Sequence, residues 1–417
     1  MGVYYTYMAS QIAVGIDVGS SSVRVVVCEY VKHLELLAIR ALVSKPSRGL
    51  RHGYIIHGDE VVRSIHEAVR EAETMAETRI KRTFLSVGGT SLGTSIGHGT
   101  VVISRPDNEV VESDVTRVTS ESEESDNGKS NYKIIHTIPL EYKLDGKKMP
   151  SRPVGYHGSR LETKTLFITA HNTHLQNLVK AVEKAGIEVE DIIASPVAES
   201  VVTLSPLQKS VGCILTNIGS ETVSVITFEE GIPVALQVFP IGSSDITSDI
   251  ALGFRVPLEN AEELKLTTEH ERGTKKKIDE IVEARLSDIF ELIELHLKKL
   301  GRNGLLPAGI VLTGAASHLP NITNLAKKYL NLPARIGINT IIPEQFKFPE
   351  IKKVTGIDSK RMERWRRHAS LVESPEWSVA FGLCIIALDM EKDESLGVRL
   401  LAQTKGRFMM WIKQFLP

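Results

Sequence analysis

The feature of this sequence that most constrains its fold is an order of segments that occurs twice. Each copy has three runs of apolar and β-branched residues, and a short polar turn separates the first two runs. The first copy comprises residues 11–18, the turn Gly19-Ser20-Ser21-Ser22, and strands at 23–30 and 34–43. The second copy comprises residues 211–218, the turn Gly219-Ser220-Glu221, and strands at 223–228 and 232–240. Because the copies start about 200 residues apart, they predict an internally duplicated α/β fold rather than a solenoid.

Further elements follow the strands of each copy. Amphipathic spacing predicts a helix over residues 60–77, with Asp59 as its N-cap, and another over 172–185. In the second copy, residues 309–313 (GIVLT) have the composition of a buried strand. Residues 377–390 are apolar nearly all round, which predicts a buried helix that is too short to cross a bilayer.

Two segments interrupt the duplication. Residues 86–162 are rich in Ser, Gly and charge, and they predict an inserted small α+β subdomain. Residues 245–303 are expected to be mostly helical. The basic run at 360–367 (KRMERWRR) is expected in a surface loop, and a solvated loop or helix is favoured there over a dedicated anion site.

Composition narrows the possible functions. The chain of 417 residues has 50 Lys and Arg against 51 Asp and Glu, and this net charge of -1 argues against a general nucleic-acid-binding surface. Its 3 cysteines lie far apart without Cys/His ligand spacing, which argues against both a zinc site and a disulfide framework. The sequence has no apolar run of about 18 residues or more, so no membrane span is predicted.

The small polar turns are candidates for phosphate binding, because such turns expose backbone N–H groups and hydroxyl donors. Asp17 stands just before the first turn, where its carboxylate can hold Mg²⁺ through water. The candidate nucleotide-binding residues are Asp17, Gly19, Ser20, Ser21 and Ser22 in the first copy, Asn217, Gly219 and Ser220 in the second, and Gly314, Ala315 and Ala316 as a platform for the nucleoside. For either turn alone, a plain hairpin is the alternative.

The last residues of the sequence have a helical amphipathic pattern. Residues 391–404 are polar and mixed, as in a linker, and 405–417 follow them. At about 100° per residue, one arc of 405–417 carries Phe408, Met409, Trp411, Ile412, Phe415 and Leu416, and the opposite side carries Arg407, Lys413 and Gln414. Such a helix can bind a membrane surface, with the cation of Lys413 near anionic lipid, or it can pack on its own protein.

The two phosphate hairpins and the segment 309–314 (GIVLTG) resemble the actin/sugar-kinase/heat-shock ATPase superfamily, and within it the FtsA family of bacterial cell-division adaptors. The resemblance is colinear from about residue 11 to 389. The segments that are similar to family segments are 45–53 (KPSRGLRHG), 84–89 (FLSVGG), 178–186 (LVKAVEKAG), 248–251 (SDIA) and 308–314 (AGIVLTG).

This resemblance implies a duplicated actin-like (ribonuclease H-like) fold in which a subdomain called 1C replaces subdomain 1B of actin. The implied division is 1A at 1–85 and 163–208, 1C at 86–162, 2A at 209–244 and 304–390, 2B at 245–303, a linker at 391–404 and an amphipathic membrane-targeting helix at 405–417. The family binds ATP with Mg between its halves.

The resemblance also implies a cytoskeletal adaptor rather than an enzyme. Members polymerise, bind the C-terminal peptide of the tubulin-like protein FtsZ, and tether the Z ring to the cytoplasmic side of the cell membrane at the division septum, where they recruit later divisome membrane proteins. Subdomain 2B receives the FtsZ peptide, so Lys298, Lys299 and Arg302 are candidate partners for that acidic peptide. An ordinary solvated helix end is the alternative for these three residues.

The second hairpin departs from the family pattern D-x-G-G-G-T-x-D. Asn217 stands in place of the leading carboxylate and cannot hold Mg²⁺ as a carboxylate does. Glu221 places a negative charge where phosphates would bind, and Ala315 and Ala316 stand where glycines are common. We therefore expect ATP hydrolysis to be weak or absent.

Two other classes of protein share this superfamily fold. A type IV pilus assembly protein of the PilM type docks a peptide from an inner-membrane partner and lacks the amphipathic tail, so residues 405–417 favour the FtsA family. A sugar or acetate kinase needs a catalytic Asp and an intact second phosphate loop, and Asn217 argues against that class.

Overall fold

The fold was obtained as a computed structural model, which describes residues 11–31, 36–125, 131–267, 269–340 and 359–394, apart from the side chains of 359–362 and 391–394. The expected amphipathic helix at 405–417 and most of the expected linker at 391–404 lie outside the described residues.

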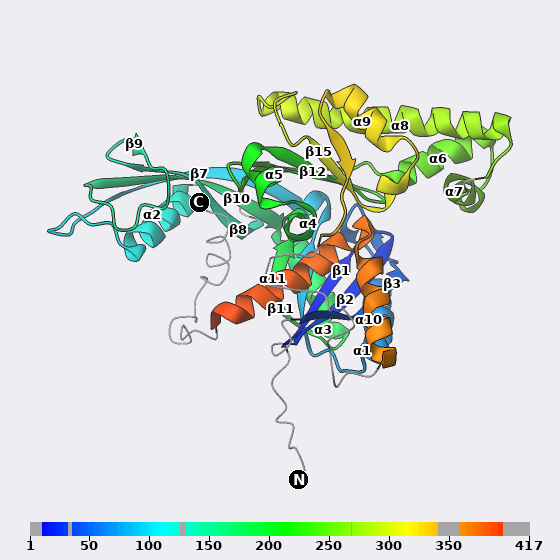
Figure 1. The fold of residues 1–417 in the computed structure, drawn as a ribbon, viewed down its shortest axis with the longest axis horizontal. Helices are drawn as coiled ribbons and strands as arrows, with labels where there is room; N and C mark the ends of the chain where they lie inside the picture. The colour runs from blue at the N-terminus through cyan, green and yellow to red at the C-terminus, as the bar shows by residue number, and fades with distance from the viewer. Residues whose placement is uncertain (1–10, 32–35, 126–130, 268, 341–358, 395–417) are drawn as a thin grey trace, which may run out of the picture.

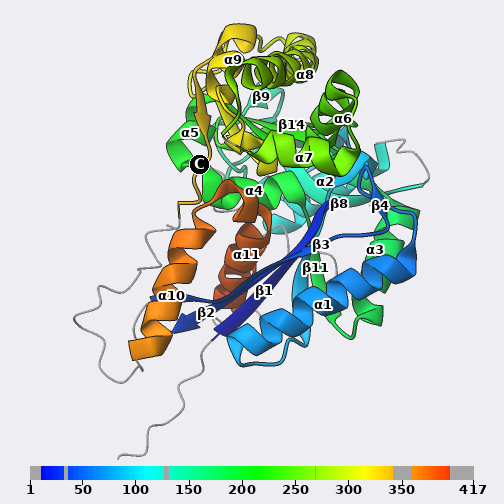
Figure 2. The ribbon, with the colours of Figure 1, turned by 90° about the vertical axis from the view of Figure 1, so that its right-hand side faces the viewer.

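The first half of the molecule is built on a five-stranded sheet of order β11-β6-β1-β2-β3 (Figures 1 and 2). The first three strands of the chain pair antiparallel, and β6 and β11 then extend the sheet in parallel from β1. The strands are β1 (Gln11–Val18), β2 (Ser22–Val31), β3 (Leu36–Pro46), β6 (Arg82–Val87) and β11 (Glu188–Ala194).

The second half repeats this arrangement in a sheet of order β14-β13-β12-β15-β16. Again three consecutive strands pair antiparallel, and two further strands pair in parallel from the first of them. The strands are β12 (Cys213–Ile218), β13 (Val223–Glu229), β14 (Ile232–Phe239), β15 (Ile310–Thr313) and β16 (Ala334–Ile336). The predicted internal duplication is therefore confirmed.

An inserted sheet of order β7-β10-β8-β9 projects from the first half, to the left in Figure 1. Its elements are β7 (Leu92–Val102), α2 (Glu112–Ser125), β8 (Tyr132–Leu144), β9 (Lys147–Lys148) and β10 (Arg160–His171). Since β10 pairs along its length with both β7 and β8, this sheet continues past residue 162. A separate small hairpin joins β4 (Leu50–Arg51) and β5 (Tyr54–Ile55).

Helices cover both sheets, and one hydrophobic core runs between the two halves. The first sheet packs against α1 (Gly58–Ala76), α3 (Asn172–Lys184), α4 (Ser195–Thr203), α10 (Ser359–Val372) and α11 (Ser378–Glu394). Helix α4 contacts strands of both sheets. Buried residues of both halves, such as Val202, Leu215 and Phe381, therefore belong to one cluster.

A second core lies on the other face of the second sheet. Its helices are α6 (Ser243–Phe254), α7 (Leu258–Leu266), α8 (Arg272–Lys299) and α9 (Ile322–Leu330), which form the upper right of Figure 1, and α5 (Pro206–Val211) lies nearer α4. The apolar spacing of α8 explains this packing, because Ile278, Val282, Leu286 and Ile289 recur at intervals of three or four and are all buried.

Two details differ from the sequence-based expectation. Helix α1 begins at Gly58 with His57 as its N-cap, so Asp59 lies in the first turn. The basic run at 360–367 lies in helix α10 rather than in a loop. Its Trp365 is buried against Leu36 and Ala38. This apolar contact gives the helix a buried side, which the many charged residues of the run do not suggest.

The cysteines and the helices bear on two further expectations from the sequence. Cys28, Cys213 and Cys384 are free and buried. Within the described ranges, no single helix is long and apolar enough to cross a bilayer. Two helical segments, Glu363–Val372 and Pro375–Met390, are together long and apolar enough, but an 88° bend separates them.

Candidate nucleotide cleft between the two halves

The two polar turns have the same hydrogen-bonded geometry. In the first hairpin the Gly19 N–H donates to the carbonyl of Ser22 at 3.0 Å. In the second, the Gly219 N–H donates to the carbonyl of Thr222 at 2.9 Å. Thus the two turns are equivalent parts of the duplication, and Glu221 occupies the position that Ser21 has in the first hairpin.

Both hairpins face one cleft of about 110 Å³ between the halves. The predicted residues that line this cleft are Asp17, Gly19, Ser20, Ser21, Asn217, Gly219, Ser220, Gly314 and Ala315. The structure does not bring the other two to the cleft. Ser22 is buried beside the first turn, and Ala316 packs into the core of the second half.

The carboxyl group of Asp17 is held in place at the end of β1. The Ser86 hydroxyl donates to Asp17 Oδ1 at 2.6 Å. Burial raises the pKa of Asp17, and the Ser86 hydrogen bond and the positive charge of Arg24 offset part of that increase. No group of three or more His, Cys, Asp or Glu residues in the described part of the chain could hold a metal ion by itself.

Two further side chains line the cleft with unsatisfied polar atoms. Within the described residues, Arg24 Nε and His174 Nδ1 are buried and have no hydrogen-bond partner. Burial lowers the pKa of His174 to about 4, so its ring is neutral at pH 7. Buried polar atoms are normally hydrogen-bonded, so these two indicate a polar ligand in the cleft.

At the floor of the cleft, a buried carboxyl group joins the two halves. The Asn217 side chain donates from Nδ2 to Glu199 Oε1 of helix α4 at 2.9 Å. Glu199 is 1% exposed, and burial raises its pKa to about 7, although hydrogen bonds from Thr313 and Asn217 act in the opposite direction. The amide at position 217 thus contacts a carboxyl group in the other half.

At the mouth of the cleft, the turn between β4 and β5 makes a second bridge. The backbone N–H of His52 donates to Glu221 Oε2 at 2.6 Å, and the His52 ring nitrogen Nδ1 lies 3.0 Å from the carbonyl oxygen of Glu221. A carbonyl oxygen only accepts, so Nδ1 carries the proton. The next residue, Gly53, donates its N–H to Ser20 Oγ at 3.2 Å. One turn therefore contacts both phosphate hairpins.

These bridges leave the cleft small. Its volume of about 110 Å³ is below the roughly 300–1,000 Å³ typical of ligand pockets.

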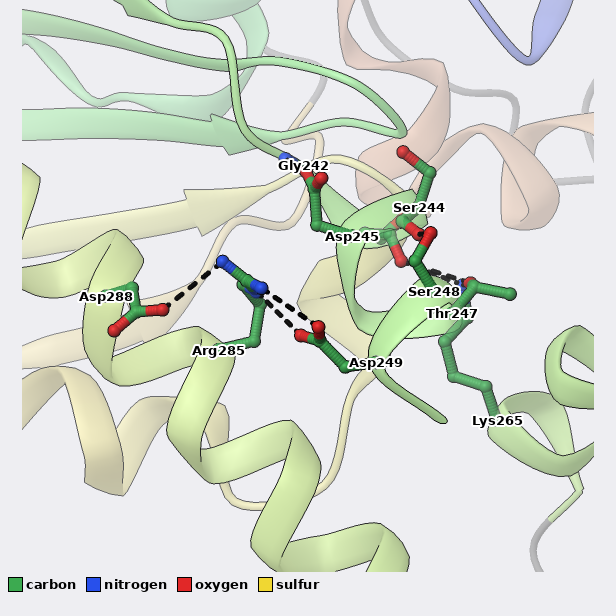
Figure 3. A network of polar contacts seen from close by, with 10 residues as sticks. Gly242, Ser244, Asp245, Thr247, Ser248, Asp249, Lys265, Arg285 and Asp288 are labelled. Atoms are coloured by element: carbon green, nitrogen blue, oxygen red, sulfur yellow. Dashed lines mark hydrogen bonds and ion pairs between the residues drawn. The ribbon is translucent and has the colours of Figure 1, made fainter. Parts of the chain in front are cut away.

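Helix α6 connects the second hairpin to the outer helices (Figure 3). The Ser244 N–H and hydroxyl both donate to the carbonyl of Ser220, at 2.8 and 2.7 Å. One turn further along α6, Asp249 accepts two hydrogen bonds from Arg285 of α8, at 2.7 and 3.0 Å, and Arg285 also reaches Asp288. A movement of the second hairpin is thereby linked to α8.

The basic residues suggested for peptide binding lie at the end of α8 and just after it. Lys298 pairs with Glu294 at 2.8 Å, and Arg302 forms a two-point ion pair with Glu229. Lys299 is exposed and has no ion pair among the described residues. An acidic peptide could pair with Lys299 directly, but it would have to compete with Glu294 for Lys298 and with Glu229 for Arg302.

Glu199 leads to a prediction about pH. Its pKa rises from 4.5 to about 7 on folding, so between these values the folded state holds a proton that the unfolded chain has released. Stability should fall as pH rises through this window, by up to about 3 kcal/mol. Chemical denaturation at pH 5 and pH 8 should show this loss as a difference between the wild type and Glu199→Gln, because buried histidines such as His174, whose lowered pKa makes stability rise with pH, titrate alike in both proteins. The exposed Glu291→Gln is the matched control, and the same pH dependence in all three proteins would contradict the assignment.

Comparison with known proteins agrees with this geometry. The family model described as "Cell division protein FtsA" matches residues 214–381, and that described as "SHS2 domain inserted in FTSA" matches 90–169. The chain is 30% identical to the cell division protein FtsA of Pseudomonas aeruginosa (79% of this chain, 84% of the relative) and 30% identical to that of Bacillus subtilis (79% of each).

Solved structures show the same fold at lower identity. The PilM-PilN type IV pilus biogenesis complex has a TM-score of 0.62 at 19% identity, covering 89% of this chain and 97% of the other. MreB5 of Spiroplasma citri bound to ADP has a TM-score of 0.50 at 11% identity, covering 93% of this chain and 99% of the other. The expected actin-like fold is confirmed, and the chain belongs to the FtsA family of cell division proteins.

Proposed function

We propose that this chain is an actin-like adaptor that links FtsZ to the cytoplasmic side of the cell membrane at the division septum. The observation that carries the proposal is the inserted sheet on a duplicated actin-like fold. The FtsA family models match the insert at 90–169 and the second half at 214–381. Self-assembly into filaments and recruitment of later divisome membrane proteins belong to the same proposal, because the resemblance to the family implies them.

The proposed division of labour follows the implied subdomains. The first half at 1–85 and 163–208 and the second half at 209–244 and 304–390 enclose the nucleotide cleft, and the insert at 86–162 projects from the first half. The helical segment at 245–303 receives the FtsZ peptide, for which Lys299 is the available cation near Lys298 and Arg302. The contacts of α6 with Ser220 and of Asp249 with Arg285 support coupling between the cleft and this segment.

Membrane attachment is proposed from the sequence pattern of residues 405–417. Phe408, Trp411, Ile412, Phe415 and Leu416 share one arc, and Lys413 adds a cation for anionic lipid. Partial burial of about five large apolar groups contributes several kcal/mol, since full burial of each contributes about 1.5–3 kcal/mol. One helix of this size binds reversibly, and a filament that presents many such helices binds firmly.

Nucleotide binding is proposed at the cleft, with Asp17, Gly19, Ser20 and Ser21 at the phosphates and Gly314 and Ala315 beneath the nucleoside. Mg²⁺ would be held through water by Asp17 and would neutralise phosphate charge. In the second hairpin Asn217 donates to Glu199, so position 217 offers no carboxylate to activate water, and the carboxylate of Glu221 is engaged by the His52 N–H.

A pilus-type assembly protein is the alternative function, because the PilM-PilN complex has the same fold. That class docks a peptide of an inner-membrane partner and has no amphipathic tail. The pattern at 405–417 therefore favours the division adaptor.

The adaptor function predicts lipid binding and FtsZ recruitment that depend on residues 405–417. In liposome co-sedimentation the full chain should pellet and bring FtsZ with it, and a 1–404 truncation should do neither. Trp411→Glu should lower lipid binding by at least about tenfold, because it removes the burial of one large aromatic group. The control Gln414→Glu, on the opposite side of the predicted helix, should bind nearly as well. If neither the full chain nor the truncation pellets with lipid, residues 405–417 are structural and the pilus-type function is favoured.

The altered second hairpin predicts little ATP turnover. With Mg²⁺ present, phosphate release by the full chain should stay at the background rate, both alone and with FtsZ. Asn217→Asp, which restores a carboxylate at the family position, tests whether this single change raises the rate. Robust turnover by the wild-type chain alone would contradict the prediction.

A further inference from the structure

The turn between β4 and β5 is aimed at the phosphate end of the cleft. Gly53 lines the cleft and has a φ of +86°, which favours glycine. It also lies so close to Gly89 that a Cβ on Gly53 would be 2.6 Å from the Gly89 Cα. The carbonyl of His52 accepts the Thr90 N–H at 3.2 Å. The backbone N–H of His52 is thus held rigidly at the mouth of the cleft.

Glu221 is the hydrogen-bond partner of this N–H. Its carboxylate accepts the His52 N–H at 2.6 Å, and the ring of His52 holds the backbone carbonyl of Glu221. A backbone N–H presented by a fixed turn is the kind of donor that binds phosphate oxygens, and a carboxylate can accept from it in the same way. At the equivalent position of the first hairpin, Ser21 carries no charge.

We infer that Glu221 is an internal anion that competes with the phosphates of a nucleotide for the His52 N–H, and so sets how tightly the cleft binds nucleoside polyphosphates. This inference rests on the nucleotide binding proposed above and assigns Glu221 a role in regulating that site. The carboxylate closes the mouth of the cleft and stabilises the closed form without a ligand. A phosphate chain that enters must displace it and is repelled by its charge.

The neighbouring contacts show what displacement involves. Gly53 also bonds Ser20 of the first hairpin, and Ser220 of the second hairpin is held by Ser244 of helix α6. Release of Glu221 from His52 therefore removes one of the two polar bridges between the second hairpin and the first half, while the Asn217–Glu199 bond and the attachment to α6 persist. Entry of phosphates is thereby coupled to opening at the mouth of the cleft.

The test measures binding of Mg–ATP and Mg–ADP by the full chain, using calorimetry on the wild type and three variants. Glu221→Ala should bind both nucleotides about tenfold to a hundredfold more tightly, because it removes a charge-assisted hydrogen bond and its charge. The nucleotide affinity of Glu221→Gln should lie between those of the wild type and Glu221→Ala, because its amide oxygen still accepts from His52 but carries no charge. The exposed Glu291→Ala on α8 should match the wild type.

Hydrogen exchange of the His52 amide provides a second readout that needs no nucleotide. In the wild type this amide should be protected, and in Glu221→Ala it should exchange at least about tenfold faster. Equal nucleotide affinity of the wild type and Glu221→Ala, or no binding by any variant, would overturn the inference, as would an unprotected wild-type amide. Failure of FtsZ recruitment to liposomes would instead refute the adaptor function, with the affinity difference unaffected.

Discussion

The two halves of this molecule meet through helix α4, which packs on both sheets and places the buried carboxyl group of Glu199 against Asn217. A charged Glu199 buried beside Asp17 would destabilise the folded protein, and the raised pKa of Glu199 reflects that cost. The hydrogen bond from Asn217 offsets part of this loss of stability. This contact joins the two halves beside the cleft.

Two of the residues at which the second hairpin departs from the family pattern, Asn217 and Glu221, bridge the halves. Asn217 bonds Glu199 at the floor of the cleft, and Glu221 bonds His52 at its mouth. In an actin-like fold a nucleotide lies between the halves and contacts both. On the account proposed here, contacts within the protein stabilise closure in this chain, and a nucleotide has to compete with them.

Much of the fold could be predicted from the sequence because its signals are local. The duplicated strands, the two polar turns and the turn at Gly314 follow from short-range patterns, and the structure brings most of their residues to one cleft. Glu199 and His52 could not be found in this way. Glu199 lies in an apolar helix, and His52 meets Glu221 across 169 positions of the chain. The charges of the run at 360–367 predict a surface loop, whereas the run belongs to helix α10 because Trp365 is buried against Leu36 and Ala38.

The most direct test of this account is the distance between the halves in the absence of nucleotide. Spin labels at the exposed positions Arg70 of α1 and Glu291 of α8 report it by pulsed electron resonance, and the native cysteines are buried. The account predicts one short distance in nucleotide-free wild type, and a broader and longer distribution in Glu221→Ala. A wild-type protein that is open without nucleotide and closes only when Mg–ATP is added would contradict it.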